Sequence, residues 1–209
     1  MGDDVHDLRE LLTRWESFYV IMGSAAATLT GLQFVVITMI TELRRRASET
    51  QTATFSTPTV IHFTAALVVS GILSAPWPSL TGPVVSLVVS GAAGVGYAAL
   101  VLRNALKQQV KRQGYRLVLE DWAWHIVLPA ITSASQTIAA LLLRRASTGA
   151  LFVIAGATVL LLLIGIHNAW DTVTFVAAQP EQIGAPASEP GEAPAGESPS
   201  GNAAPKPGA

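Results

Sequence analysis

Long apolar segments separated by short polar ones dominate the pattern of this chain. Few charges interrupt the segments, and each is about the 17–25 residues that a helix needs to cross roughly 30 Å of hydrocarbon. They are continuously apolar and lack the strict alternation of a membrane barrel, so they predict helices. Five segments have this character: 18–41, 59–75, 84–102, 122–143 and 149–170. The predicted fold is all-α, a polytopic membrane helix bundle with five transmembrane helices. Four, with the last two merged into a buried hairpin, is the competing count.

The segment before the first apolar stretch has the pattern of an amphipathic helix. Within residues 1–17, apolar positions recur at helical spacing, which would gather them on one face. Helices of this kind lie in the plane of a membrane surface. The apolar positions are Val5, Leu8, Leu12 and Trp15. We expect a short amphipathic helix here, ahead of the helix bundle of residues 18–178.

The C-terminal segment, residues 179–209, has a different composition. It holds seven of the 12 prolines, five of the 17 glycines and four glutamates. Such a segment cannot bury enough apolar surface to offset the entropy that is lost when a chain becomes ordered. We expect a disordered tail, which could act as a tether for a protein partner.

The charges of the chain are segregated in a way that predicts its orientation. Charged residues make up 13% of the sequence, against about 25% in soluble domains. With five crossings, the loops after the first and third apolar segments share one face and carry eight basic residues: Arg44, Arg45, Arg46, Arg103, Lys107, Lys111, Arg112 and Arg116. The positive-inside rule makes that face cytoplasmic, which puts the N-terminus outside and the C-terminus inside. We expect the basic loops to meet lipid headgroups, and no nucleic acid.

Small residues recur at a spacing of four in the first apolar segment. Gly23, Ala27 and Gly31 would share one helix face there, and Ser86, Ser90 and Gly94 repeat the pattern in the third segment. In lipid, small residues at this spacing let helix backbones approach closely. The pattern fits ordinary packing within the bundle and also a homo-oligomer contact, and the sequence does not separate the two.

Polar residues within the apolar segments are the next feature. In the fourth segment His125, Pro129, Thr132 and Gln136 fall on one stripe, and Gln33 lies in the first segment. Such groups face the bundle interior or a hydrated cavity. They could form interhelical hydrogen bonds, worth about 0.6 kcal/mol each on average. They could also line a polar path between the first and fourth helices.

Three of the four histidines fall at segment ends that share one membrane face. Counting the spans puts three imidazoles and three carboxylates at this depth: His62, His125, His167, Glu42, Asp121 and Asp171. The pattern allows three interpretations. The rings could sit singly at the headgroup interface, form a proton or ion site, or bind a metal such as zinc through the three histidines. No close-spaced ligand pair supports the metal, and no cofactor is required by the sequence.

The most unusual string is GIHNAWDTV, residues 165–173. His167 and Asp171 are four apart, and Asn168 and Asp171 are three apart, so both pairs can meet on one helix face. Together with GSAAATLTGLQFV near the N-terminus, this string resembles an uncharacterised bacterial family of small multi-pass membrane proteins. The resemblance covers about residues 15–176. It implies a bacterial inner-membrane location and transfers no catalytic residue.

Three functions follow as hypotheses. The first is permeation of an ion or small solute, with or without protons, through a self-associating bundle that uses Glu42, His62, His125, His167 and Asp171 at its mouth. The second is a non-catalytic membrane scaffold or regulatory partner. The third and weakest is a metal-dependent membrane hydrolase. The sequence has no P-loop, dinucleotide fingerprint or nucleophile elbow, so we do not expect a familiar enzyme.

Overall fold

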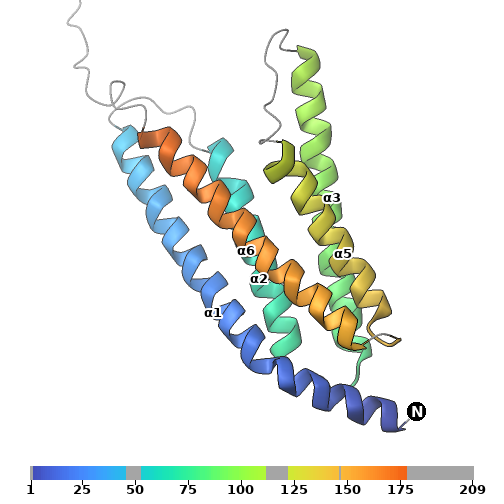
Figure 1. The fold of residues 1–209 in the computed structure, drawn as a ribbon. Helices are drawn as coiled ribbons and strands as arrows, with labels where there is room; N and C mark the ends of the chain where they lie inside the picture. Colours follow the sequence, from blue (N-terminus) through green and yellow to red (C-terminus); the bar gives the residue numbers. More distant parts are fainter. Residues whose placement is uncertain (1, 46–52, 112–121, 146, 178–209) are drawn as a thin grey trace, which may run out of the picture.

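The computed structural model describes residues 2–45, 53–111, 122–145 and 147–177, and these are helical apart from short turns. The elements are α1 (Gly2–Arg45), α2 (Ala53–Ser74), α3 (Thr81–Lys111), the π-helical turn η1 (Ala123–Val127), α5 (Leu128–Leu142) and α6 (Ser147–Ala177) (Figure 1). The predicted all-α helix bundle is confirmed. The tail predicted for residues 179–209 and much of the basic loops lie outside the described residues.

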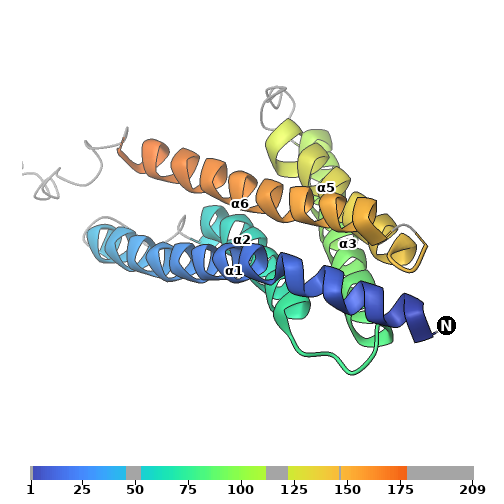
Figure 2. The same cartoon turned by 60° about the horizontal axis from the view of Figure 1, so that its bottom comes forward.

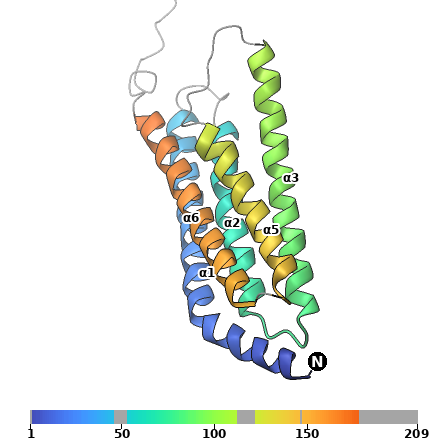
Figure 3. The same cartoon turned by 45° about the vertical axis from the view of Figure 1, so that its right-hand side comes forward.

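The helices alternate in direction and α6 joins two groups of them. Helices α1, α2 and α6 contact one another on one side, while α3 packs with α5 on the other, and the contact of α5 with α6 links the two sides (Figures 2 and 3). One end of the bundle therefore collects the C-terminal ends of α1, α3 and α6 with the N-terminal ends of α2 and η1. We call this the His end, and the opposite one the Tyr19 end.

Four helices are long and apolar enough to cross a membrane. The spans are Glu10–Met39, Thr81–Lys107, Ala123–Leu142 and Thr148–Thr174. The apolar part of α2, Thr59–Ser74, is shorter than these, so a fifth crossing stays a prediction. The last two segments are both candidate spans, unlike the merged hairpin of the four-span alternative. Helix α6 is the central one, because 56% of its span is buried, against 11% for α1.

The N-terminal segment is part of the first helix. The sequence predicted a separate short amphipathic helix, but α1 continues for 44 residues without a break. Its first turns curve beneath the Tyr19 end (Figure 1). There Leu11, Leu12 and Trp15 pack against the apolar core of the bundle. The apolar face that suggested a surface helix therefore has a protein partner, which explains why the helix does not end before the span.

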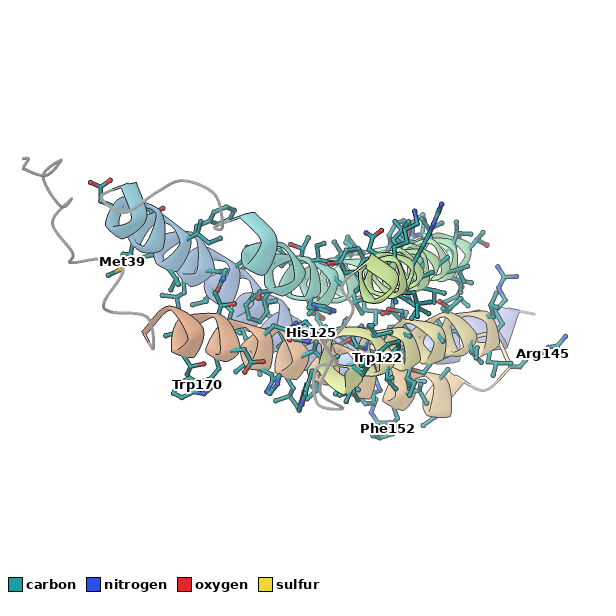
Figure 4. All side chains as sticks on the ribbon, turned by 90° about the horizontal axis from the view of Figure 1, so that it is seen from above. Met39, Trp122, His125, Arg145, Phe152 and Trp170 are labelled. Atoms are coloured by element: carbon teal, nitrogen blue, oxygen red, sulfur yellow. The ribbon has the colours of Figure 1, made fainter. Side chains whose placement is uncertain are left out.

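Exposed aromatic rings mark two levels along α6. Phe152 and Trp170 are 62% and 67% exposed, and Figure 4 shows both side chains on the outside of the bundle. They are 18 residues apart in sequence, which corresponds to about 27 Å along a helix, close to the thickness of the hydrocarbon layer. Aromatic residues at two such levels are typical of membrane interfaces. The middle of the span then lies near Leu161.

The connection from α2 to α3 is built around one tryptophan. The indole Nε1 of Trp77 donates a hydrogen bond to the carbonyl of Ile72 at 2.6 Å, which satisfies a carbonyl in the last turn of α2. The face of the same ring lies where a Cβ on Gly82 would stand. Glycine at position 82 therefore lets the start of α3 approach the ring.

Small residues make the closest helix contacts. A Cβ on Gly94 would collide with Ser133 of α5, and one on Gly23 would lie 3.1 Å from the Cβ of Ser70. Ordinary packing within the bundle therefore accounts for these two positions. A Cβ on Gly31 would meet nothing within 4 Å, and Ala27 is exposed. Of the stripe predicted in the first span, Gly23 therefore packs closely against α2, whereas Ala27 and Gly31 make no such close contact.

Gly165 and Gly156 of α6 offer a matched test of this packing. A Cβ at Gly165 would meet the buried ring of Phe63, whereas one at Gly156 would meet nothing within 4 Å. We expect Gly165→Ala to destabilise the protein by about 1–3 kcal/mol through overpacking. Gly156→Ala should leave stability unchanged or raise it by up to about 1 kcal/mol. Thermal unfolding in detergent measures both, and equal effects would contradict the α2–α6 packing.

Candidate polar site at the His end of the bundle

His167 has two specific neighbours near the end of α6. Its Nε2 lies 3.2 Å from Oδ2 of Asp171, one turn further along the helix. Its ring stacks on Trp124 of η1, with centroids 3.9 Å apart and planes at 21°. The contact between His167 and Asp171 that the spacing of four predicted is therefore present, and the indole of Trp124 lies against the imidazole.

The π-helical turn brings Trp124 to this position. The N–H of Leu128 bonds to the carbonyl of Ala123, five residues back, where an α-helix would reach four. Pro129 follows directly, and because it has no N–H it cannot bond to the carbonyl of His125 four residues before it. Pro129 thus interrupts the hydrogen-bond pattern of an α-helix at this point. Such turns are frequent at functional sites.

His62 and His125 lie at the same end with other neighbours. His62 is buried on α2, and its ring stands at 76° to the half-buried Tyr97 of α3, with centroids 6.4 Å apart. His125 is half-buried in η1, and the view along the bundle places it between the α1–α2–α6 group and the α3–α5 pair (Figure 4). The structure therefore gathers the imidazoles at one end, with different ring partners for His62 and His167.

The described residues contain no group of three or more His, Cys, Asp or Glu side chains that could hold a metal ion. All three histidines of the metal hypothesis are within the described part of the chain, so that hypothesis has no geometric support. Glu42 is exposed near the end of α1. Asp121 lies outside the described residues.

The polar residues of α5 are used in packing. Gln136 donates from Nε2 to the carbonyl of Leu87 at 3.4 Å, and Thr132 donates to the carbonyl of Leu128 at 2.7 Å. These bonds tie α5 to α3 and to itself. Helices α1 and α5 are not among the closely packed pairs. Gln33 and Gln136 therefore belong to different interfaces, and the path predicted between the first and fourth spans is not built from them.

Helical spacing from an apolar cluster of α1, α2 and α6 leads to a second set of polar residues. This cluster contains Ala26, Ala66 and Leu161, one from each helix. A step of seven residues keeps nearly the same helix face and moves about 10 Å along the axis. A step of seven residues toward the His end leads from each of these three apolar residues to a polar one on the same helix. The polar residues are Gln33 on α1, Thr59 on α2 and Asn168 on α6. We call these three residues the amide–hydroxyl layer.

Every member of the amide–hydroxyl layer is buried, and each has at least one side-chain polar atom without a hydrogen-bond partner among the described residues. Gln33, Thr59 and Asn168 are 4%, 0% and 3% exposed. Nε2 of Gln33, Oγ1 of Thr59 and both side-chain polar atoms of Asn168 have no hydrogen-bond partner among the described residues. Each such group costs about 1–3 kcal/mol when it is buried unpaired. The layer can therefore bind a molecule that supplies the missing partners.

The Tyr19 end of the bundle is closed by apolar side chains. Tyr19, Leu87, Leu143, Leu151 and Ile154 are fully buried there, and residues of α1, α3, α5 and α6 take part. We call these five residues the apolar seal. The hydroxyl of Tyr19 donates to the carbonyl of Leu151 at a long 3.5 Å. Buried side-chain atoms without a hydrogen-bond partner among the described residues thus lie in the amide–hydroxyl layer, and also at Ser70 and Ser74 on α2, toward the Tyr19 end.

Sequence reasoning identified Gln33, Asn168, His167 and Asp171 but missed Thr59, Tyr97 and Trp124. Thr59 lies seven residues before the buried Ala66, a signal that becomes readable only once the face of α2 is known. Comparison of the chain with protein-family models, curated proteins and solved structures finds no match. The family resemblance of the two sequence strings therefore stays a prediction, and the function is inferred from this site.

Proposed function

We propose that the protein mediates permeation of an ion or small solute across a membrane, through the bundle formed by α1, α2, α3, α5 and α6. The observation that carries the proposal is the amide–hydroxyl layer. Asn168 lies seven residues, or about 10 Å, from the middle of the α6 span, so the layer is inside the hydrocarbon region. Unpaired polar groups there are costly and typically mark substrate pathways.

The two ends of the bundle support a transport cycle. The His167–Asp171 pair and the stacked Trp124 form a polar entrance at the His end, and the apolar seal around Leu151 closes the Tyr19 end. We assign the His end to the cytoplasm of a bacterium on the basic residues after the first and third spans.

His167→Ala and Asp171→Asn test the entrance. In proteoliposomes we expect each to lower the flux of the permeant species up to about fivefold, since a solvent-exposed pair of this kind is worth up to about 1 kcal/mol. The assay should compare protons, potassium and acetamide as permeants, with empty vesicles as the baseline. Trp170→Leu is the matched control, because Trp170 neighbours Asp171 but is 67% exposed. Unchanged flux in both site variants would remove the pair from the mechanism, and no flux at all would refute the proposal.

A second candidate is a scaffold that binds a membrane or soluble partner. One observation favours it: Arg103, Asn104, Leu106 and Lys107 are exposed on the part of α3 that extends toward the His end beyond the core. A scaffold would show no flux for any permeant. It would instead lose a purified partner from detergent pull-down when Arg103 and Lys107 are both changed to Glu, a variant that should leave permeation intact under the first proposal.

A further inference from the structure

We infer that the amide–hydroxyl layer is a binding site for a small uncharged solute that both donates and accepts hydrogen bonds, such as a primary amide or a polyol. Its role in transport rests on the proposed function, whereas binding does not.

The unpaired atoms of the layer are of both kinds. The amide nitrogens of Gln33 and Asn168 each offer two N–H donors, and the Thr59 hydroxyl can donate or accept. The carbonyl oxygen of Asn168 adds an acceptor. A ligand that satisfies this set must itself present donors and acceptors. A purely apolar molecule would leave the layer unpaired, and a species with acceptors alone would leave the Asn168 carbonyl unpaired.

The uncharged character of the layer argues against an ion. None of its three residues ionises, and the nearest carboxylate on the described part of α6, Asp171, is directed to His167 at 3.2 Å. A bare ion would lose its hydration without gaining a countercharge, which is strongly unfavourable in a protein interior. A cation would also find few oxygens, because the three side chains of the layer offer one each, while hard cations take six or more. An uncharged molecule avoids both costs.

The packing beneath the layer limits the size of the ligand. One turn further toward the middle of the membrane, the ring of Phe63 lies directly against Gly165, which leaves no room for even a Cβ. Ile164 is fully buried at the same level. The layer therefore has an apolar floor, and a bound molecule is held between α1, α2 and α6 above it.

The three asparagines of the chain, Asn104, Asn168 and Asn202, make the binding test sharp. Protein labelled with ¹⁵N only at asparagine would give three pairs of side-chain amide signals in nanodiscs, with Asn168 identified by its loss in Asn168→Leu. We expect acetamide to shift the Asn168 signals saturably and to leave those of Asn104 and Asn202 in place. Thr59→Val should weaken the apparent affinity at least threefold. Thr158→Val, whose hydroxyl already bonds to the carbonyl of Ile154, should not.

The outcomes separate this inference from the proposed function. Saturable shifts by acetamide without any flux would uphold the site and refute permeation. Flux without a shift at Asn168, or shifts produced by potassium chloride at the same osmolarity and not by acetamide, would overturn the site while permeation stands. Signals of Asn168 that respond to neither probe but exchange rapidly with water would make the layer a hydration site only, which also overturns the inference.

Discussion

A variant in which the amide–hydroxyl layer is made apolar is expected to be more stable than the parent protein by about 2–4 kcal/mol. The substitutions are Gln33→Met, Thr59→Val and Asn168→Leu, each close in volume to the residue it replaces. Every unpaired buried polar group costs about 1–3 kcal/mol, and bridging waters recover part of that cost in the parent. The gain should be less than the sum of the single variants, because the three residues share one interface.

Reversible unfolding in mixed micelles measures this gain. Thr158→Val is the matched control, since Thr158 is equally buried on α6 but its hydroxyl donates to the carbonyl of Ile154 at 2.8 Å. Removing a hydroxyl that is already satisfied should change stability by less than about 1 kcal/mol. A triple variant that is less stable than the parent would mean that the three side chains form bonds that hold the bundle together, and the layer would lose its interpretation as a site.

Leu151→Ala is expected to have the second large effect, at the opposite end of the molecule. Leu151 is fully buried in the apolar seal and its carbonyl accepts the hydroxyl of Tyr19. Truncation should destabilise the protein by about 2–5 kcal/mol through the cavity it leaves. Under the proposed function the seal closes the transport path, so the same cavity should also raise the passive flux of acetamide above that of the parent protein. The amide–hydroxyl layer is unchanged in this variant.

Phe152→Ala is the control for this effect. Phe152 is the next residue in sequence, but its side chain is 62% exposed and packs on Trp15 at the surface. It should alter stability less than Leu151→Ala and should not raise flux. A destabilised Leu151→Ala protein with unchanged or lower flux would show that the Tyr19 end is packed for stability alone and does not gate permeation.

The helices were predictable because their causes are local. Apolar length defines each span, and prolines at positions 76, 78 and 83 mark the turn between α2 and α3. The His167–Asp171 contact followed from a spacing of four on a helix. The continuity of α1 could not be predicted in this way, because Trp15 near its start packs on Phe152 of α6, which lies far along the chain.

The arrangement of the helices was not predictable from the pattern. A segment that is apolar all round does not reveal which face meets which neighbour, so Gln33 could be matched with Gln136 although α2 and α6 pack between their helices. The stacking of Trp124 on His167 depends on a π-helical turn, which periodicity reasoning treats as ordinary α-helix. Thr59 carried no signal until Ala66 was known to be buried beside Ala26 and Leu161.

The decisive measurement is the rate of acetamide uptake into proteoliposomes, followed by stopped-flow light scattering. We predict faster uptake with the parent protein than in empty vesicles, and uptake at the empty-vesicle rate with the Gln33→Met, Thr59→Val, Asn168→Leu variant. Because that variant is expected to be the more stable protein, a loss of flux cannot be assigned to unfolding. Equal uptake rates with the parent and the variant would contradict the claim that solute passes through the amide–hydroxyl layer.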